Sequence, residues 1–413
     1  MNLKQLGILL ILVIVLGGAG LALYKNQNAA WRSGGGEAGG KLLGNLPVND
    51  ITRISIRQGD DAVDLVRTND EWRVRQRDDY PANFGQISEF LRKALEWKIV
   101  QSETAGPAQL ARLQLAPPGQ GTNSAMVVEF DGSNGKPLQT LWVGKAHMKE
   151  APPGEQGYGQ EGWPDGRYVR TGHSDTVAII SDPLDQVQPK PSDWLDKDFL
   201  RVDKAKSVEV DFPENTNSWK LTRETESGPW KLADAKSGDE LDSSAAGEIS
   251  SPLSSVSVTD VLPGGKLMGS PTNPITLVKI ETFDGFGYTV QVGRKVGQDY
   301  PLTETVTARI SDRRVPGKGE KPADKAKLDQ EFKTQRDKLE AKLKQEEGYE
   351  NWTYLVPSWS IDPLLKHRAQ LLAAKKEPSK KEIAGNGDGE KSSMAGASAE
   401  KAQSEAEPVG SGK

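Results

Sequence analysis

The hydrophobic pattern divides this chain of 413 residues into segments of different character. Residues 6–24, LGILLILVIVLGGAGLALY, carry no charge, and at about 1.5 Å per residue a helix of this length just spans a hydrocarbon core of roughly 30 Å. No clean cleavage site follows, which favours an uncleaved transmembrane anchor at residues 1–24 over a signal peptide. A flexible glycine-rich linker is predicted at 25–47, and a disordered tail without aromatic residues at 369–413.

Between these segments, short runs alternate apolar and polar residues, as half-buried β-strands do. ITRISIRQ (51–58) and DLVRTNDEWRV (64–74) form one group. KSVEVDF (206–212) and KLTRETESGPWKL (220–232) form a second group some 150 residues later, with the same Leu-x-Arg followed by a tryptophan. The recurrence indicates that one structural unit is written twice.

A helical pattern follows the strands in each group. In the first, the residues predicted on one helical face are Phe84, Ile87, Leu91, Ala94 and Leu95. In the second, Ile249 and Leu253 keep this spacing, but Pro252 makes the helix short or kinked.

Two further elements recur in the same order. Each group has a strand pair with Phe-Asp-Gly at the predicted turn, at 130–132 and 283–285. Each also has an Asp-Pro-Leu segment, in which Asp182 and Asp362 are predicted to cap helices that begin at the following proline.

These matched elements predict an α+β fold. An N-terminal transmembrane helix precedes two tandem repeats of a β-rich α+β module, at residues 48–202 and 203–368. Trp72 and Trp230 are expected at equivalent core positions of the two modules.

The second repeat alone contains an insertion, at residues 318–348, that is rich in strong helix formers. Its narrow apolar face consists of Leu328, Phe332, Leu339 and Leu343, between charges of both signs. The helix either lies solvated against its own domain or projects as an arm that binds a partner helix, as in a coiled coil. We expect it to be attached at its ends and lightly packed, so that its deletion leaves the fold intact.

Composition narrows the possible functions. The net charge of -5 argues against a nucleic-acid-binding protein, and the absence of cysteine excludes disulfides and thiolate sites. None of the three histidines, His147, His173 and His367, has a second ligand at metal-binding spacing. No G-x-S-x-G or S-x-x-K element occurs in a strand-to-helix context, so the sequence predicts no catalytic, cofactor-binding or metal-binding residue.

Three weaker signals have structural explanations. Paired carboxylates such as Asp60–Asp61 and Asp78–Asp79 fall in predicted turns, where solvent explains them. Arg67 with Trp72 and Arg223 with Trp230 could clasp a ligand, but their recurrence favours packing of a shared scaffold. GYGQEGWPDGRY (157–168) is either a binding loop or the tip of a hairpin.

Several stretches together resemble a bacterial family known as domain of unknown function 4340. The segments that carry the resemblance are ITRISIRQGDDAVDLVRTNDEWRV, YPANFGQISEFLRKALEWKIV, LQLAPP, GRYVR and TVAIISDPL. They cover residues 48–201 well and the second repeat more loosely. The resemblance implies one N-terminal membrane helix followed by a repeated extracytoplasmic domain. Some members are encoded near auxiliary components of gliding-motility-type ABC transporters, and no catalytic residue is implied.

The function predicted from these features is that of a membrane-anchored, non-enzymatic interaction or scaffold protein of the bacterial envelope. The expected location is the cytoplasmic (inner) membrane, single-pass, with most of the chain extracytoplasmic and an envelope or transporter protein as partner. One alternative is an envelope hydrolase with carboxylates at the cleft between the repeats, and another is a solute-binding subunit. Convergent carboxylates in a deep pocket would favour the hydrolase, and an apolar cleft the solute-binding subunit.

Overall fold

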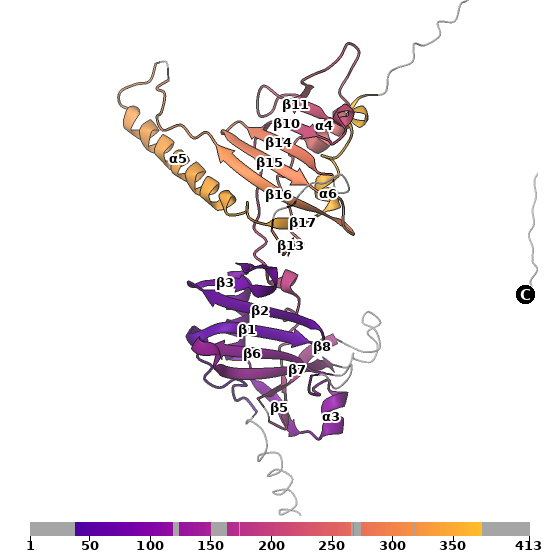
Figure 1. Cartoon of the computed structure of the whole chain (residues 1–413). Helices are drawn as coiled ribbons and strands as arrows, with labels where there is room; N and C mark the ends of the chain where they lie inside the picture. Colours follow the sequence, from indigo (N-terminus) through magenta and orange to yellow (C-terminus); the bar gives the residue numbers. More distant parts are fainter. Residues whose placement is uncertain are drawn as a thin grey trace, which may run out of the picture. The chain divides into compact units, whose positions relative to one another are not determined.

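Two large antiparallel β-sheets dominate the structure (Figure 1). This computed structural model describes residues 38–118, 124–149, 163–172, 174–265, 267, 274–317 and 319–373. Helices are few, so the predicted α+β class is wrong and the fold is mostly β.

The membrane prediction is also corrected. Within the described ranges, no helix is both long and apolar enough to cross a bilayer. The expected anchor at 1–24 lies outside those ranges, as do the first part of the linker and residues 374–413 of the tail.

The first sheet has nine strands in the order β4-β3-β2-β1-β6-β7-β8-β9-β5. Its strands are β1 (Ile51–Gln58), β2 (Asp61–Thr68), β3 (Glu71–Val74), β4 (Tyr80–Pro81), β5 (Ile99–Thr104), β6 (Met126–Gly132), β7 (Pro137–Lys149), β8 (Trp163–Thr171) and β9 (Thr176–Ile180). The associated helices are α2 (Phe84–Glu96) and α3 (Pro107–Arg112), with 3-10 turns at Val48–Asp50, Arg75–Arg77, Ser133–Gly135 and Pro191–Trp194.

The second sheet has eight strands in the order β12-β11-β10-β14-β15-β16-β17-β13. Its strands are β10 (Ala205–Asp211), β11 (Trp219–Thr222), β12 (Lys231–Leu232), β13 (Asp260–Leu262), β14 (Thr276–Thr282), β15 (Phe286–Val292), β16 (Asp299–Ala308) and β17 (Thr353–Pro357). The helices are α4 (Ser243–Ile249), α5 (Lys325–Glu347) and α6 (Ser358–Ile361), with 3-10 turns at Asn215–Asn217 and Arg368–Leu371.

Apart from β4, the two sheets have the same order of strands along the chain. The pairing register also shifts at corresponding positions of the two sheets. The shift lies between Ile51 and Arg53 in the β1–β6 pair, and between Ala205 and Ser207 in the β10–β14 pair. This correspondence supports the tandem duplication, which stays a prediction. The two tryptophans differ in burial, since Trp72 is 6% exposed whereas Trp230 is only partly buried.

Helix α2 shows how the first sheet acquires its core. Asn83 caps the helix by accepting a hydrogen bond from the backbone N–H of Gln86. The buried face consists of Ile87, Phe90 and Ala94. Phe84, predicted on that face, is 66% exposed because the buried face begins one turn later than the spacing suggested.

The Asp-Pro-Leu segments do not begin helices. The carboxylate of Asp182 accepts hydrogen bonds from the N–H of Leu184 and from the indole of Trp97, and no helix follows it directly. Asp362 follows α6 and accepts a hydrogen bond from the hydroxyl of Tyr300. Of the two Phe-Asp-Gly sequences, the one at 283–285 forms a turn, whereas the one at 130–132 continues β6.

The ordered region extends beyond both predicted boundaries. Leu42, Leu43 and Leu46, assigned to the flexible linker, are buried in the core. At the other end Leu371 is fully buried, and Ala373 still donates a backbone hydrogen bond to Glu240. The glycine content of the linker and the charge of the tail predicted flexible segments. Buried apolar side chains within them instead hold these residues against the core.

Candidate functional site

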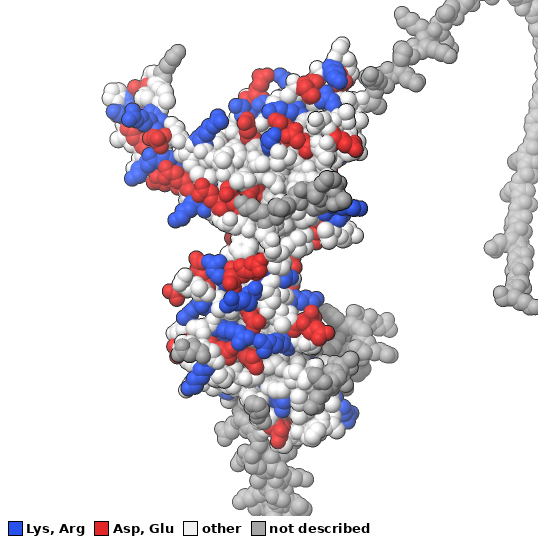
Figure 2. All heavy atoms as spheres, viewed as in Figure 1, with Lys and Arg blue, Asp and Glu red and all other residues white. Residues whose placement is uncertain are grey.

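Helix α5 is the feature that most distinguishes the second sheet from the first. It is one helix of 23 residues beside a sheet, with no helical partner among the described residues, so the coiled-coil expectation is wrong (Figure 1). Its partly or fully buried positions form one face: Leu328, Phe332, Arg336, Leu339, Lys342, Leu343 and Glu346. The other positions are exposed, and positive and negative side chains alternate along them (Figure 2).

The two ends of α5 are held differently. Near its C-terminus, Leu339 and Leu343 pack against the core, and Glu346 is 4% exposed. At the N-terminal end, Arg314 of the preceding loop donates a hydrogen bond of 2.7 Å to Asp329. The helix is therefore part of the core at one end and is tied to its own lead-in loop at the other.

Large aromatic side chains explain why the C-terminal end docks. Phe286 and Tyr288 of β15 are almost fully buried, and the amine of Lys342 lies 4.8 Å and 5.8 Å from their ring centroids. In the first sheet, Gln139 faces Phe130 as Tyr288 faces Ile280, and Gln139 is only half-buried. The second sheet thus has the aromatic ring of Tyr288 at the position where the first sheet has the polar side chain of Gln139. Helix α5 packs over this aromatic surface.

Two carboxylates are buried beneath this end of α5. The hydroxyl of Tyr288 donates a 2.9 Å hydrogen bond to Glu346, and the amine of Lys342 lies 3.8 Å from the same carboxylate. Burial is the main cause of the raised pKa of Glu346, because it disfavours the charged form.

Glu304, on β16, is the more unusual of the two. It is 2% exposed, and neither carboxylate oxygen has a hydrogen-bond partner among the described residues. Burial raises the pKa of Glu304 to about 8, and the nearby charges of Glu346 and Glu350 act in the same direction. At neutral pH this side chain is therefore mostly a neutral acid.

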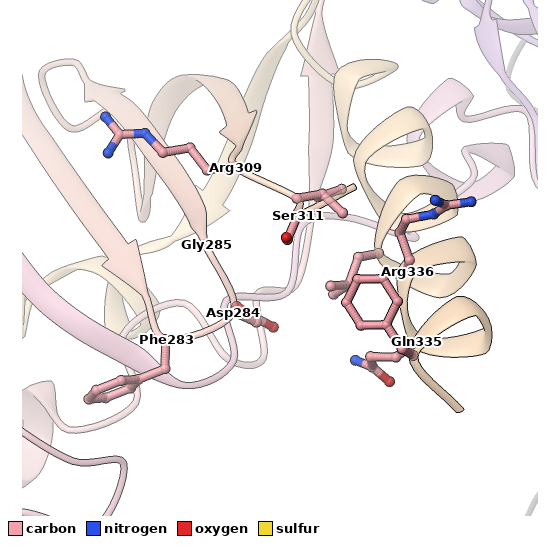
Figure 3. A pocket seen from close by; sticks show the side chains of 10 residues that line it. Phe283, Asp284, Gly285, Arg309, Ser311, Gln335 and Arg336 are labelled. Carbon is pink, nitrogen blue, oxygen red and sulfur yellow. The ribbon is translucent and has the colours of Figure 1, made fainter. Parts of the chain in front are cut away.

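A pocket of about 260 Å³ lies between α5 and the sheet (Figure 3). Its walls are the β14–β15 turn, the residues after β16, and α5; they comprise Phe283, Asp284, Gly285, Arg309, Ile310, Ser311, Phe332, Gln335, Arg336 and Leu339. The Asp284 carboxylate is directed toward α5, whereas the guanidinium groups of Arg309 and Arg336 point away from the pocket (Figure 3).

The turn side of the pocket is rigid. Gly285 has a φ of +91°, and a Cβ at this position would lie 2.7 Å from the carbonyl oxygen of Arg309. The N–H of Arg309 donates to the carbonyl of Gly285, and the hydroxyl of Thr282 donates to Asp284. These contacts hold the wall of the pocket in one conformation.

Two polar side chains of the pocket wall are engaged in hydrogen bonds of their own. The hydroxyl of Ser311 donates to the carbonyl of Arg313. Asp284 is engaged by Thr282, and neither Glu304 nor Glu346 lines the pocket. The pocket therefore offers an apolar wall, made by Phe332, Leu339 and Ile310, with the Thr282-bound carboxylate of Asp284 beside it.

The candidate residues from the sequence do not converge on this pocket. His147 pairs with Asp165 at 2.5 Å, His367 packs on Phe212, and His173 lies outside the described residues. The described part of the chain contains no group of three or more potential metal ligands.

The two arginine–tryptophan pairs also differ. The guanidinium of Arg223 stacks 4.6 Å from the Trp230 ring and donates to the carbonyl of Ala205, which indicates packing. Arg67 pairs with Trp72 across the strands but donates to the carbonyl of Asn49. In the suggested binding loop, residues 157–162 lie outside the described ranges and the remainder belongs to β8.

One signal for the buried carboxylates was present in the sequence. Glu304 is in phase with Leu302 and Val306 in the alternation of β16, and both neighbours are buried. A glutamate at an inward position of a strand indicates either a buried acid or an element that covers it.

Comparison with known proteins identifies a family but no individual relative. Neither the curated proteins nor the solved structures contain a match to this chain. A family model matches residues 155–275, a range that spans the end of the first predicted repeat and the start of the second rather than 48–201. The match confirms the resemblance seen in the sequence: residues 155–275 are similar to the family described as Domain of unknown function (DUF4340).

Proposed function

We propose that this chain is a non-enzymatic interaction protein whose docking element is helix α5 together with the pocket beneath it. The observation that carries the proposal is that only the C-terminal end of α5 packs against the core, whereas Leu328 and Phe332, although partly buried, lie outside it. Lys342 and Glu346 contact the side chains of β15 near the C-terminal end, yet the helix continues for 14 residues before Leu339, from Lys325 to Lys338. That extension buries little surface and contributes little to folding, so it is available for binding.

The pocket supplies the specificity that a charged helix alone lacks. Interfaces take most of their binding energy from a few apolar or aromatic anchors that fill such pockets, while surrounding charges orient the partner. Phe332 and Leu339 can receive one apolar side chain of a partner protein, and the mixed charges along α5 surround that contact.

The proposal places the partner in the bacterial envelope, as an envelope or transporter component, and places this chain outside the cytoplasm. The support is the resemblance to a family whose members include proteins encoded near auxiliary components of ABC transporters.

The buried carboxylates favour a structural role over hydrolysis. A glycosidic or peptide hydrolase needs carboxyl groups that reach the scissile bond. Glu304 and Glu346 are 2% and 4% exposed, and neither lines the α5 pocket.

The experiment places a photo-crosslinking amino acid at Gln335 in the pocket and compares capture of protein in cells with and without Phe332→Ala. Leu328→Ala is the matched control, because Leu328 lies on the same face of α5 but does not line the pocket. We expect Phe332→Ala to reduce capture of one specific protein at least tenfold and Leu328→Ala to leave it unchanged, since loss of one anchor contact costs about 1–2 kcal/mol or more. Equal capture by all three proteins would refute the proposal.

A further inference from the structure

A second pocket, of about 370 Å³, lies on the face of the first sheet opposite to its main core. Cross-strand pairing places its residues on that face, since Arg57 is opposite Val127, which is opposite Trp142, and Glu129 is opposite Thr140. The intervening residues of β1, β6 and β7 point to the core. The volume is in the range of small-molecule sites.

Trp142 forms a fixed aromatic wall of this pocket. Arg170 of β8 is its cross-strand neighbour, and the guanidinium lies 4.0 Å from the ring centroid, a close cation–π contact. Arg170 is itself 7% exposed, so the contact is rigid. On the other side of β7, Val127 of β6 is the cross-strand neighbour of Trp142, and both residues line the pocket.

The polar side chains beside the indole offer both donors and acceptors. Arg57 and Gln58 can donate, Glu129 accepts, and the hydroxyl of Thr140 does both. The Arg57 guanidinium lies 3.5 Å from Glu129 and 3.5 Å from Asp64, distances too long for good hydrogen bonds. Its charge is balanced, while its hydrogen-bonding capacity remains available.

This combination selects against two simple classes of ligand. An anion would need a cation without a counter-charge, and Arg57 has two carboxylates near it. A wholly apolar ligand would cover Glu129 and Thr140 without offering them a hydrogen bond, which is unfavourable for polar groups removed from water. A sugar ring satisfies both surfaces, since its C–H face packs on an aromatic ring and its hydroxyl groups donate and accept at the rim.

We propose that this pocket binds one neutral pyranose ring of a glycan, stacked on Trp142 and hydrogen-bonded at its edge by Arg57, Glu129 and Thr140. The site is separate from the α5 pocket, so it adds a glycan-binding activity to the proposed protein interaction.

The test is isothermal titration of the full chain with maltotriose and with tri-N-acetylchitotriose, and inorganic phosphate serves as the anionic comparison. We expect saturable binding of at least one sugar at one site per chain, weakened about tenfold or more by Trp142→Ala. Trp359→Ala is the matched control, because Trp359 is a 65% exposed tryptophan of α6, and this variant keeps the parental affinity.

A second variant keeps the test decisive if Trp142→Ala does not fold. Glu129→Ala changes a side chain that is 38% exposed, and it is expected to weaken the sugar at least about fivefold. Absence of saturable binding to either sugar up to about 10 mM, unchanged affinity in both variants, or saturable binding of phosphate in place of sugar would overturn the assignment.

Discussion

The buried acid Glu304 makes a quantitative prediction about stability and pH. Its pKa of about 8 in the folded protein stands against an ordinary value of 4.5. Between these values the folded state holds a proton that the unfolded chain has released, so the free energy of unfolding falls as pH rises. The slope reaches about 1.4 kcal/mol per pH unit between the two pKa values, which amounts to about 5 kcal/mol over the whole window; it flattens near the folded pKa, so the change between pH 6 and pH 8 is about 2 kcal/mol.

Replacing Glu304 with glutamine removes the titration and keeps the shape of the side chain. We expect the parent protein to lose about 2 kcal/mol of stability between pH 6 and pH 8, and Glu304→Gln to lose much less. The raised pKa of Glu346 acts in the same direction in both proteins, and its interaction with Glu304 is part of the difference between them. Urea unfolding followed by circular dichroism at both pH values measures the effect.

The test compares the change of unfolding free energy with pH in the two proteins, because the titrations of groups that do not interact with Glu304 contribute equally to each. Parallel curves of stability against pH for parent and variant would show that Glu304 does not carry its proton in the folded state. The reasoning that connects its burial to its protonation would then be wrong.

Two further predictions concern the attachment of α5 and the wall of its pocket. Leu339→Ala should lower the free energy of unfolding by about 1–3 kcal/mol, since the side chain packs on the core, whereas Leu328→Ala should change it by less than about 1 kcal/mol; equal urea midpoints would contradict this division of the helix. Gly285→Ala should cost about 2–4 kcal/mol because of its φ of +91° and the nearby carbonyl, and Gly297→Ala, with a φ of +62° and nothing within 4 Å, should cost less in the same assay. A smaller loss for Gly285→Ala than for Gly297→Ala would show that the turn yields easily.

Alternation of apolar and polar residues was sufficient to find most strands. ITRISIRQ became β1, and the second Phe-Asp-Gly became the β14–β15 turn, because period-two burial and turn chemistry are local properties. The helix content was overestimated, since an aspartate before a proline can cap a helix but can equally bind a neighbouring indole, as Asp182 does with Trp97. That choice is made by a residue 85 positions away in the sequence.

The packing of α5 could not be predicted from its own composition. Its sequence alone indicated a solvated helix that could be deleted without loss of the fold. The docking of its C-terminal end depends instead on Tyr288 in a distant strand, and Glu346, which looks like one more surface charge, accepts the hydrogen bond of that tyrosine. Deletion of the helix is therefore now expected to expose Phe286 and Tyr288 and to destabilise the second sheet.

The unequal anchoring of α5 also has a mechanical consequence. Glu346 is buried in the core, whereas the opposite side of α5 is exposed to solvent. The helix can therefore transmit a force from its exposed part to the buried residue. A force that a bound partner applies at Phe332 acts at a distance of about 21 Å from Glu346 along the helix, at 1.5 Å per residue. The resulting torque falls on the hydrogen bond between Tyr288 and Glu346, so a load on the helix is transmitted to the interior of the sheet rather than absorbed at the surface.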